Sequence, residues 1–306
     1  MIVVVCLNPA LDVTHQLDAV GWGEVNRPRA VHARPGGKGL NVARTLHALG
    51  ADVLVLGLAG GITGAGVEAA LRELGVPTAF TPVTGETRRT FSIVDDSRVT
   101  AFHEAGPEVG AAEFAEFCTD YQKAAAEAQA VVLSGSLPPG LPAGTYATLI
   151  QTAGIPVVLD THGEALRRGA AAGPAVVKPN LAELAALAGR PLTARRGAEL
   201  AAVAAGELGR AGAVVVTLGP QGLLAATGDG RWRVRMPAAV AGNATGAGDA
   251  VTAALAHGIV AGRPWHERLR HAVALGAATA AAPVAGEFRP QDYLDALRAV
   301  MVEEVR

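Results

Sequence analysis

Short apolar runs alternate along the chain with longer segments rich in Ala, Leu, Glu and Arg. Runs such as Val53–Leu58 and Ala130–Leu133 contain no charged residue, which is typical of strands that are buried on both faces. The opening run Ile2–Leu7 has the same character and ends at Asn8 and Pro9. The alternation of such strands with helices predicts an α/β fold, in which helices cover both faces of a parallel sheet. The other predicted strands are Pro156–Leu159, Ala175–Val177 and Ala213–Leu218. The predicted helices are Gly39–Leu49, Val67–Leu74, Glu113–Gln129, Gly144–Ala153, Leu181–Ala188 and Ala198–Gly209.

Two segments depart from this rhythm. Leu11–Ala33 and Thr87–Glu104 alternate polar and apolar residues and lack helical spacing, so they are predicted to be half-exposed strands. A small sheet inserted in an α/β fold is well placed to cover a site at the carboxyl ends of the main strands. We therefore expect one domain spanning residues 1–306, with a β lid built from about 11–33 and 87–104.

Composition excludes several classes of protein. Half of the 306 residues are hydrophobic, 18% are charged and the net charge is −2, so a generally basic surface for nucleic acid is excluded. The only cysteines, Cys6 and Cys118, belong to no metal-binding cluster, which fits free thiols in a reducing compartment. The uncharged stretch 130–159 contains four prolines, which a membrane-spanning helix would not tolerate, and the apolar start lacks a basic leader. We expect a cytoplasmic protein that binds neither nucleic acid nor membrane.

A run of small residues, Asn243–Gly248, precedes Asp249 and the helix-like segment Ala250–His257. Small residues leave the first amide groups of a helix open, and those donors together with the helix dipole favour a phosphate. A carboxylate would repel a static phosphate, so Asp249 makes sense as the base that removes a proton from an attacking hydroxyl. The alternative is a glycine-rich turn in which Asp249 merely caps the helix.

A second glycine-rich turn, Arg34–Ala43, includes Gly37 and Lys38 and leads into a predicted helix. It resembles half of a P-loop, but no Ser or Thr follows the lysine. We expect the glycine backbone to lie against a polyol, while Lys38 and Asn41 reach its polar groups. The alternative is a tight turn that only begins an amphipathic helix.

Three further stretches follow predicted strands. Asn180 and Glu183 lie three residues apart at a helix start, so they either form a capping box or order water around Mg²⁺, and both are compatible. Thr217–Gly222 and Ser134–Gly140 are strand-to-turn passages whose glycines permit close approach of a ligand, although each could be an ordinary turn.

Two adjacent arginines lie on a strand of the expected lid. Because neighbouring residues of a strand point to opposite faces, only one of Arg88 and Arg89 can enter the site, where it would suit a phosphate. A solvated charge is the alternative.

Taken together, these stretches resemble the ribokinase-like, PfkB-type carbohydrate kinases, in the branch of the phosphofructokinases and tagatose-6-phosphate kinases. The resemblance covers nearly the whole chain in order. The stretches that carry it are Leu7–Asp12, Gly36–Gly50, Thr87–Arg88, Ser134–Gly140, Asp160–Glu164, Lys178–Glu183, Thr217–Gly222 and Ala244–Asp249.

The resemblance implies a Rossmann-like core, a β lid that serves as a homodimer clasp, and ATP with Mg²⁺ as the donor. It implies that Asp249 is the catalytic base and that the amides of Gly246, Ala247 and Gly248 form an anion hole. The residues that it assigns to the sugar phosphate are Asp12, Gly37, Lys38, Asn41, Arg88 and Ser136. Those that it assigns to the nucleotide are Asn180, Thr217, Gly219 and Gly222, with Glu183 acting on Mg²⁺ through water.

The expected reaction is ATP-dependent phosphorylation of a ketohexose phosphate. Lys38 and Arg88 are two cations that would converge on one end of the substrate, and this favours fructose 1-phosphate over tagatose 6-phosphate and fructose 6-phosphate. Two other classes of protein were weighed. An NAD-dependent dehydrogenase would use Gly64 and Gly66 in a dinucleotide turn, and a non-catalytic regulator would only bind a sugar phosphate.

Overall fold

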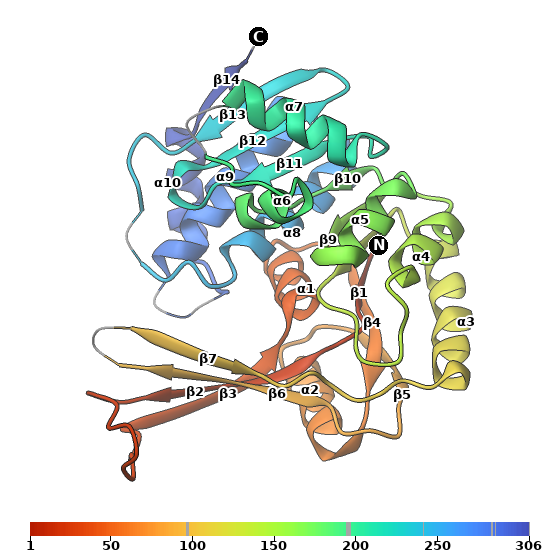
Figure 1. Cartoon of the computed structure of the whole chain (residues 1–306), viewed down its shortest axis with the longest axis vertical. Coiled ribbons are helices and arrows are strands. Elements are labelled where there is room, and N and C mark those ends of the chain that lie inside the picture. The colour runs from red at the N-terminus through yellow and green to blue at the C-terminus, as the bar shows by residue number, and fades with distance from the viewer. Residues whose placement is uncertain (96–97, 194–196, 241, 283, 285, 306) are drawn as a thin grey trace.

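Two sheets of unequal size organise the chain (Figure 1). The computed structural model describes residues 1–95, 98–193, 197–240, 242–282, 284 and 286–305. The large sheet forms the body, and the small sheet projects from it on one side, at the lower left of Figure 1. No helix in these described ranges is long and apolar enough to cross a lipid bilayer.

The large sheet has ten strands in the order β14-β13-β12-β11-β10-β9-β8-β1-β4-β5. Strands from β11 to β5 in this order run parallel, whereas β12, β13 and β14 extend the sheet in antiparallel pairs. The parallel strands are β1 (Ile2–Cys6), β4 (Val53–Ala59), β5 (Thr78–Pro82), β8 (Ala130–Ser134), β9 (Val157–Asp160), β10 (Val176–Val177) and β11 (Val214–Thr217). The antiparallel strands are β12 (Leu223–Thr227), β13 (Gly230–Arg235) and β14 (Met301–Glu304), and a short 3₁₀ turn, η1 (Gly219–Gln221), follows β11.

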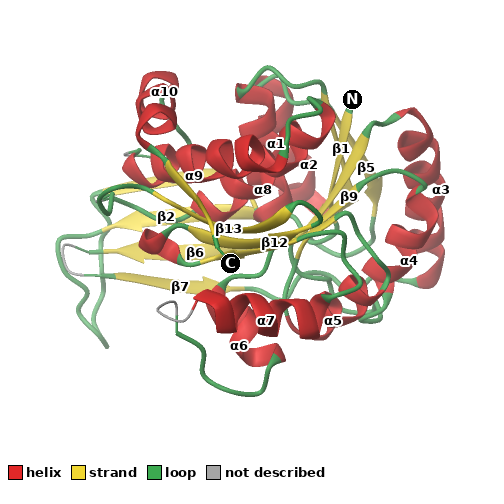
Figure 2. Ribbon diagram, turned by 90° about the horizontal axis from the view of Figure 1, so that it is seen from above, coloured by secondary structure: helices red, strands yellow, loops and turns green. Residues whose placement is uncertain are grey.

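Helices cover both faces of this sheet, as Figure 2 shows from above. One face carries α1 (Lys38–Ala48), α2 (Gly61–Glu73), α8 (Ala247–Val260) and α9 (Trp265–Ala281), and α10 (Pro290–Ala299) packs against α9. The other face carries α3 (Ala111–Glu127), α4 (Thr145–Ala153), α5 (Gly163–Ala171), α6 (Leu181–Leu187) and α7 (Gly197–Leu208). The core therefore forms two apolar layers, one on each side of the sheet, and the α/β prediction is confirmed.

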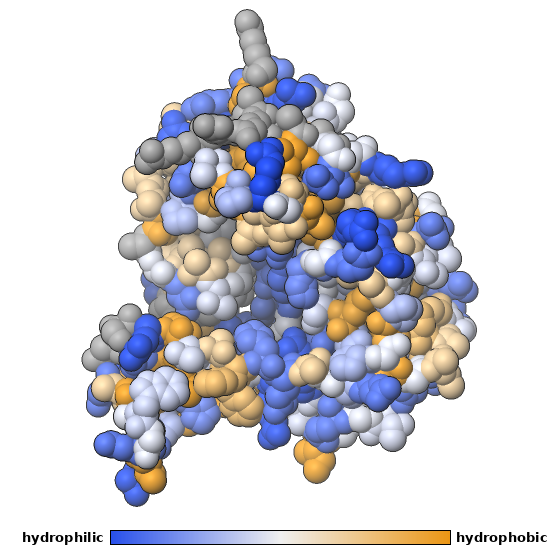
Figure 3. All heavy atoms as spheres, in the orientation of Figure 1, coloured by the Kyte–Doolittle hydropathy of each residue, from blue (hydrophilic) through white to orange (hydrophobic). Residues whose placement is uncertain are grey.

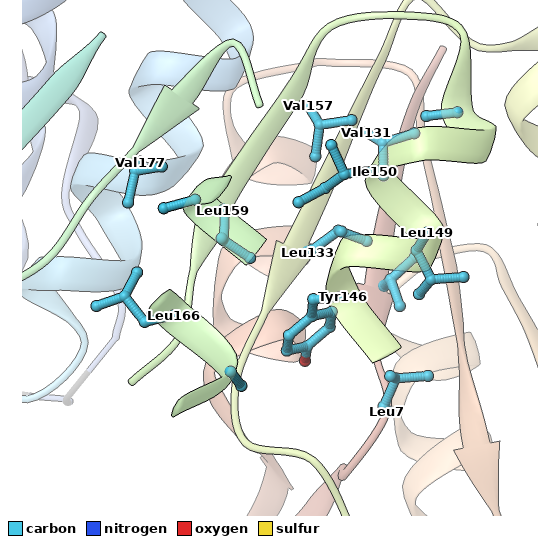
Figure 4. Close-up of a cluster of buried hydrophobic side chains, with 14 of the residues drawn as sticks. Leu7, Val131, Leu133, Tyr146, Leu149, Ile150, Val157, Leu159, Leu166 and Val177 are labelled. Carbon is cyan, nitrogen blue, oxygen red and sulfur yellow. The ribbon is translucent and has the colours of Figure 1, made fainter. Parts of the chain in front are cut away.

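The layer under α3–α7 gathers the large buried side chains shown in Figure 4. Tyr146 and Leu149 of α4 pack there with Leu133 of β8 and Leu159 of β9. Burying a side chain such as Leu149 contributes about 1.5–3 kcal/mol. Tyr146 also donates its hydroxyl to the carbonyl of Gly135 at 3.1 Å, so its polar end is satisfied inside the core.

The small sheet has four strands in the order β3-β2-β6-β7. Its strands are β2 (Ala10–Gln16), β3 (Ala30–Gly36), β6 (Arg88–Val94) and β7 (Val99–His103). The predicted segments 11–33 and 87–104 therefore do form a separate sheet, although residues 96–97 lie outside the described part. Its register places Arg34, Asp12, Thr90 and His103 side by side on one face. Residues one step along each strand point to the opposite face.

Most of the predicted elements are present within a few residues of their expected bounds, but some were missed. Helix α2 begins at Gly61, so Gly64 and Gly66 lie inside a helix. The proposed dinucleotide turn at these glycines is therefore wrong. The sequence pattern did not predict strands β5 and β12–β14 or helices α5, α9 and α10. Of these strands, β5 forms one edge of the large sheet and β12–β14 complete the other end.

Two glycines in helices allow a matched test of the packing. A Cβ added to Gly39 of α1 would lie 2.6 Å from Cys6 Cβ, whereas a Cβ at Gly66 of α2 would meet nothing within 4 Å. We expect Gly39→Ala to lower the free energy of unfolding by about 1–3 kcal/mol through overpacking. Gly66→Ala should raise it by roughly 0.5–1 kcal/mol. Urea denaturation measures both, and equal effects of the two changes would contradict the close contact of α1 with β1.

Candidate active site

Two cavities meet at the carboxyl ends of the parallel strands, where α1 and α8 begin. The larger has a volume of about 1140 Å³ and lies between the small sheet and the body. The smaller, of about 400 Å³, lies among α8, α9 and the turn after β11. In the space-filling view the larger one opens as a hollow beside the small sheet (Figure 3).

All six residues predicted to bind the substrate line the larger cavity. They are Asp12, Gly37, Lys38, Asn41, Arg88 and Ser136, and Glu183 lies there too. The four predicted nucleotide residues, Asn180, Thr217, Gly219 and Gly222, line the smaller cavity. The structure thus brings the two predicted sets together as two adjoining groups. Their binding roles remain predictions.

The segment before α8 runs between the two cavities. Asn243 and Thr245 face the larger, whereas Ala247 and Gly248 face the smaller. Gly246 is the N-cap of α8 with φ 84°, a conformation that favours glycine. A Cβ at Gly246 would lie 2.6 Å from Gly286 Cα, so the close approach of the two loops also requires glycine. The Ala247 amide donates to the carbonyl of Ala244 at 3.1 Å, so Gly246 and Gly248 carry the amides at this helix start that suit a ligand.

Asp249 lies in the first turn of α8 and is buried, with 7% of its surface exposed. Asn41 donates its side-chain amide to Asp249 Oδ2 at 2.9 Å. Burial and the negative charge of Asp160 raise the pKa of Asp249 to about 6, against the opposing effects of Lys38 and Asn41. A carboxylate with this pKa is charged at neutral pH and can still accept a proton readily.

The centre of the site is an ion cluster that the sequence did not reveal. Asp160, at the end of β9, is fully buried and binds Lys38 Nζ at 2.9 Å and Lys178 Nζ at 3.2 Å. Thr252 of α8 donates its hydroxyl to Asp160 Oδ2 at 2.7 Å. Burial alone would raise the pKa of Asp160, but Lys178 and Lys38 outweigh burial and lower it. Asp160 and Lys178 each follow a buried strand, and a lone charge in that position is the signal that could have indicated them.

Lys38 differs from the free cation that the sequence suggested. Its ammonium binds Asp160 and lies 3.7 Å from Glu183 Oε1, and 38% of its side chain is exposed. Burial would lower the pKa of Lys38, but the carboxylates of Asp160, Glu183 and Asp249 outweigh it and raise the pKa. Lys38 therefore reaches the larger cavity with its charge already largely compensated.

Asn180 and Glu183 form the capping box at the start of α6. Asn180 Oδ1 accepts from the Glu183 amide and Glu183 Oε2 accepts from the Asn180 amide, each at 2.8 Å. Glu183 Oε1 lies on the side of Lys38. No group of three or more His, Cys, Asp or Glu capable of holding a metal occurs in the described ranges. This donor set fits Mg²⁺ only if water and phosphates supply most of its ligands, as Mg²⁺ commonly accepts.

Strand β6 places the two adjacent arginines on opposite faces of the small sheet. Arg88 lines the larger cavity, and its guanidinium donates to the carbonyls of Asn8 at 3.2 Å and Glu104 at 3.3 Å. Arg89 is half exposed, pairs with Glu104 at 3.6 Å and lies over the ring of Phe91. The expected alternation is therefore present, and Arg88 is the one that faces the cavity.

One wall of the larger cavity is closely packed around Asp12. Thr90 donates its hydroxyl to Asp12 Oδ1 across the small sheet. A Cβ on Gly36 would overlap the Asp12 carboxylate at 1.9 Å, so glycine leaves the space that Asp12 fills. Ser136 Oγ accepts from the amide of Asn8 at 3.2 Å on the facing wall.

Solved structures with the same architecture are known. The chain is similar to phosphofructokinase-2 from Escherichia coli in complex with potassium, with 29% identity over 97% of this chain and 98% of that one, and a TM-score of 0.89. It is also similar to a Thermotoga maritima protein described as a possible 1-phosphofructokinase, with 27% identity, coverage of 100% and 99%, and a TM-score of 0.89.

A family model agrees with these likenesses. The model of the pfkB family carbohydrate kinases matches residues 4–292, a span that includes the small sheet, both cavities, Asp249 and the large sheet apart from β14 and the first two residues of β1. The match leaves no support for a dehydrogenase. The chain belongs to the pfkB family of carbohydrate kinases.

Proposed function

We propose that this kinase transfers the γ-phosphoryl group of ATP to a ketohexose phosphate in the cytoplasm. Fructose 1-phosphate is the proposed preferred acceptor, and fructose 1,6-bisphosphate is the product. The observation that carries the proposal is that the two cavities share the segment Asn243–Gly248 as a wall, and that this segment leads into the first turn of α8, where Asp249 lies. The acceptor would occupy the larger cavity and the nucleotide the smaller.

Asp249 is the proposed base. Its raised pKa of about 6 keeps the carboxylate ionised at neutral pH but close to the pH at which proton transfer is efficient. The amide of Asn41 donates to Oδ2 of Asp249, and Asn41 itself lines the larger cavity, so the base is one hydrogen bond away from that cavity. A general base of this kind contributes about 10²–10⁴-fold to the rate. A regulator that only bound sugar phosphates would gain nothing from a carboxylate beside a phosphate site.

The smaller cavity suits a nucleotide because glycines and small apolar residues form its walls. Of the three amides expected to form the anion hole, those of Gly246 and Gly248 would hold the transferring phosphoryl group, because that of Ala247 already donates to the carbonyl of Ala244 at 3.1 Å. When bound, Mg²⁺ would neutralise charge on the phosphates. Glu183 Oε1 would orient water around that ion, while Glu183 Oε2 continues to cap α6.

Arg88 is the proposed cation for a substrate phosphate in the larger cavity, which Arg34 also lines, because the charge of Lys38 is shared with Asp160 and Glu183. Among the similar structures are Escherichia coli phosphofructokinase-2 in complex with fructose-6-phosphate, at 29% identity, and the Thermotoga maritima protein described above. Fructose 6-phosphate and tagatose 6-phosphate are the alternative acceptors. All three sugars place a phosphate opposite a primary hydroxyl.

The outer face of the small sheet supports a proposal of homodimer formation through that sheet. Val31 and Phe102 leave 55% and 50% of their surfaces exposed, and Phe91 lies on the same face. Exposed apolar residues gathered on one sheet face favour pairing with a second copy.

A coupled assay of ADP release tests the function directly. The acceptors are fructose 1-phosphate, fructose 6-phosphate, tagatose 6-phosphate, fructose and ribose. We expect fructose 1-phosphate to give the highest kcat/KM, and the unphosphorylated sugars to be poorer by about 10³-fold because they cannot satisfy the cationic pocket. Asp249→Asn should lower kcat by at least about 10²-fold while ATP still binds. Equal rates with ribose, or an Asp249→Asn variant close to wild type, would refute the proposal.

The pH dependence of kcat should report Asp249. Because its pKa is raised and its ionised form is the active one, activity should fall as the pH drops through about 6 and stay high above it. Fructose has no phosphate to titrate, so the same fall in kcat at low pH with fructose as acceptor would show that the titrating group belongs to the protein. A kcat that stays constant between about pH 5 and 8 would be inconsistent with an ionised base of this pKa.

The two adjacent arginines provide a matched pair for phosphate recognition. Arg88→Ala should lower kcat/KM for fructose 1-phosphate by about 10–10²-fold, because a charge-assisted contact is lost, and should change the value for fructose little. Arg89→Ala should change kcat/KM for both sugars by less than about threefold, since the ion pair of Arg89 with Glu104 is exposed. The reverse ranking of the two variants would show that Arg88 does not contact the phosphate.

A further inference from the structure

Helices α1 and α8 each present two polar side chains to the ion cluster, three residues apart. On α1 these are Lys38 and Asn41, and on α8 they are Asp249 and Thr252. Residues three apart lie on the same side of a helix, so each pair spans about one turn. The amide of Asn41 reaches Asp249 at 2.9 Å, which forms one link between the two helices.

Asp160 forms the second link. Its Oδ1 binds Lys38 on α1 at 2.9 Å, and its Oδ2 accepts from Thr252 on α8 at 2.7 Å and binds Lys178 at 3.2 Å. The four helix residues and Asp160 therefore close a ring around the first turns of α1 and α8. Both oxygens of Asp160 are occupied and the residue is fully buried. Asp160 is absent from the lining of both cavities.

We propose that Asp160 and Thr252 are positioning residues for phosphoryl transfer, which fix the first turn of α8 in the rotation that aims Asp249 at the acceptor. The inference rests on the proposed role of Asp249 as the base. Neither residue touches a substrate in this account. Each acts through the helix that carries the reacting groups.

The contacts of Thr252 show how the positioning works. Its hydroxyl lies 3.1 Å from the carbonyl of Gly248 as well as 2.7 Å from Asp160. Gly248 lines the nucleotide cavity, and a Cβ there would lie 3.8 Å from Lys178 Nζ. One hydroxyl thus ties the turn containing Gly248 and Asp249 to a carboxylate that two lysines hold rigidly. A small displacement of that turn would move the base and the anion-binding amides together, and displacements of about 1 Å can cost 10²-fold in rate.

Thr252→Val is the decisive variant, because valine has the shape of threonine but lacks the hydroxyl, and Thr252 lines neither cavity. We expect kcat to fall by about 10-fold, the effect of losing one hydrogen bond to a charged group. KM for ATP and for fructose 1-phosphate should each stay within about twofold, as expected when only transition-state stabilisation is lost. Thr252→Ser, which restores the hydroxyl, should recover most of kcat.

Thr45→Val is the matched control. Thr45 is a buried threonine of α1 whose hydroxyl donates only to the carbonyl of Asn41 within its own helix, at 2.9 Å. This variant should retain wild-type kcat within about twofold, since no link between helices is removed. A Thr252→Val enzyme with wild-type kcat, or one in which Thr252→Ser fails to recover activity, would overturn the inference.

Asp160→Asn distinguishes positioning from a role at the metal. We expect a larger fall in kcat, about 10²-fold, because the buried Lys178 and the partly exposed Lys38 both lose the counter-charge of Asp160. The Mg²⁺ concentration that gives half-maximal rate should not change, and a clear rise would overturn the inference by placing Asp160 at the ion. If Asp160→Asn does not fold, Thr252→Val still tests the positioning role. An active Asp249→Asn enzyme would refute the proposed function itself, whereas an inactive Asp249→Asn with a fully active Thr252→Val would refute only the positioning role.

Discussion

The pairing of Asp160 with Lys38 and Lys178 is the interaction on which the rest of the site depends. Three charges lie together at the carboxyl edge of the sheet, and Asp160 and Lys178 are almost completely enclosed. Removing such charges from water costs several kcal/mol per ion, so the arrangement persists only because each charge has a partner. Strands β9 and β10 are neighbours, so parallel pairing brings Asp160 and Lys178 side by side. Lys38 then connects the start of α1 to Asp160, and Thr252 connects α8 to it.

Electrostatic compensation also explains why the two acidic residues behave differently. Asp160 pairs with two lysines and has a lowered pKa. Within the described ranges, Asp249 has the Asn41 amide as its hydrogen-bond partner, and its pKa is raised. The charge of Asp160 contributes to the raised pKa of Asp249. One carboxylate thus stabilises the architecture, while the other remains able to exchange a proton. Two groups of the same type acquire different roles because their surroundings separate their pKa values.

Much of this arrangement could be predicted from local sequence. Uncharged strands and the glycine turn before Asp249 are local signals, and so is the Asn180–Glu183 capping box. The ion cluster was not predictable in this way, because Asp160, Lys178 and Thr252 meet only after strands and helices pack. For the same reason Lys38 could be assigned to the cavity, but its existing carboxylate partners could not be foreseen. Strand β14 was missed because it is four residues long, includes two glutamates and depends on pairing with β13.

The small sheet constrains how this chain can vary during evolution. Its cavity face and its outer face alternate residue by residue, so Arg88 and Arg89 have unrelated surroundings. Inserting or deleting one residue within β6 would exchange the two faces, turning Phe91 inwards and Thr90 outwards. Changes of two residues, or substitutions that preserve the alternation, would keep the faces intact. Side chains that line the larger cavity along β2, β6 and β7 can therefore be replaced without altering the outer face, whereas the gain or loss of one residue inside a strand would disturb both faces.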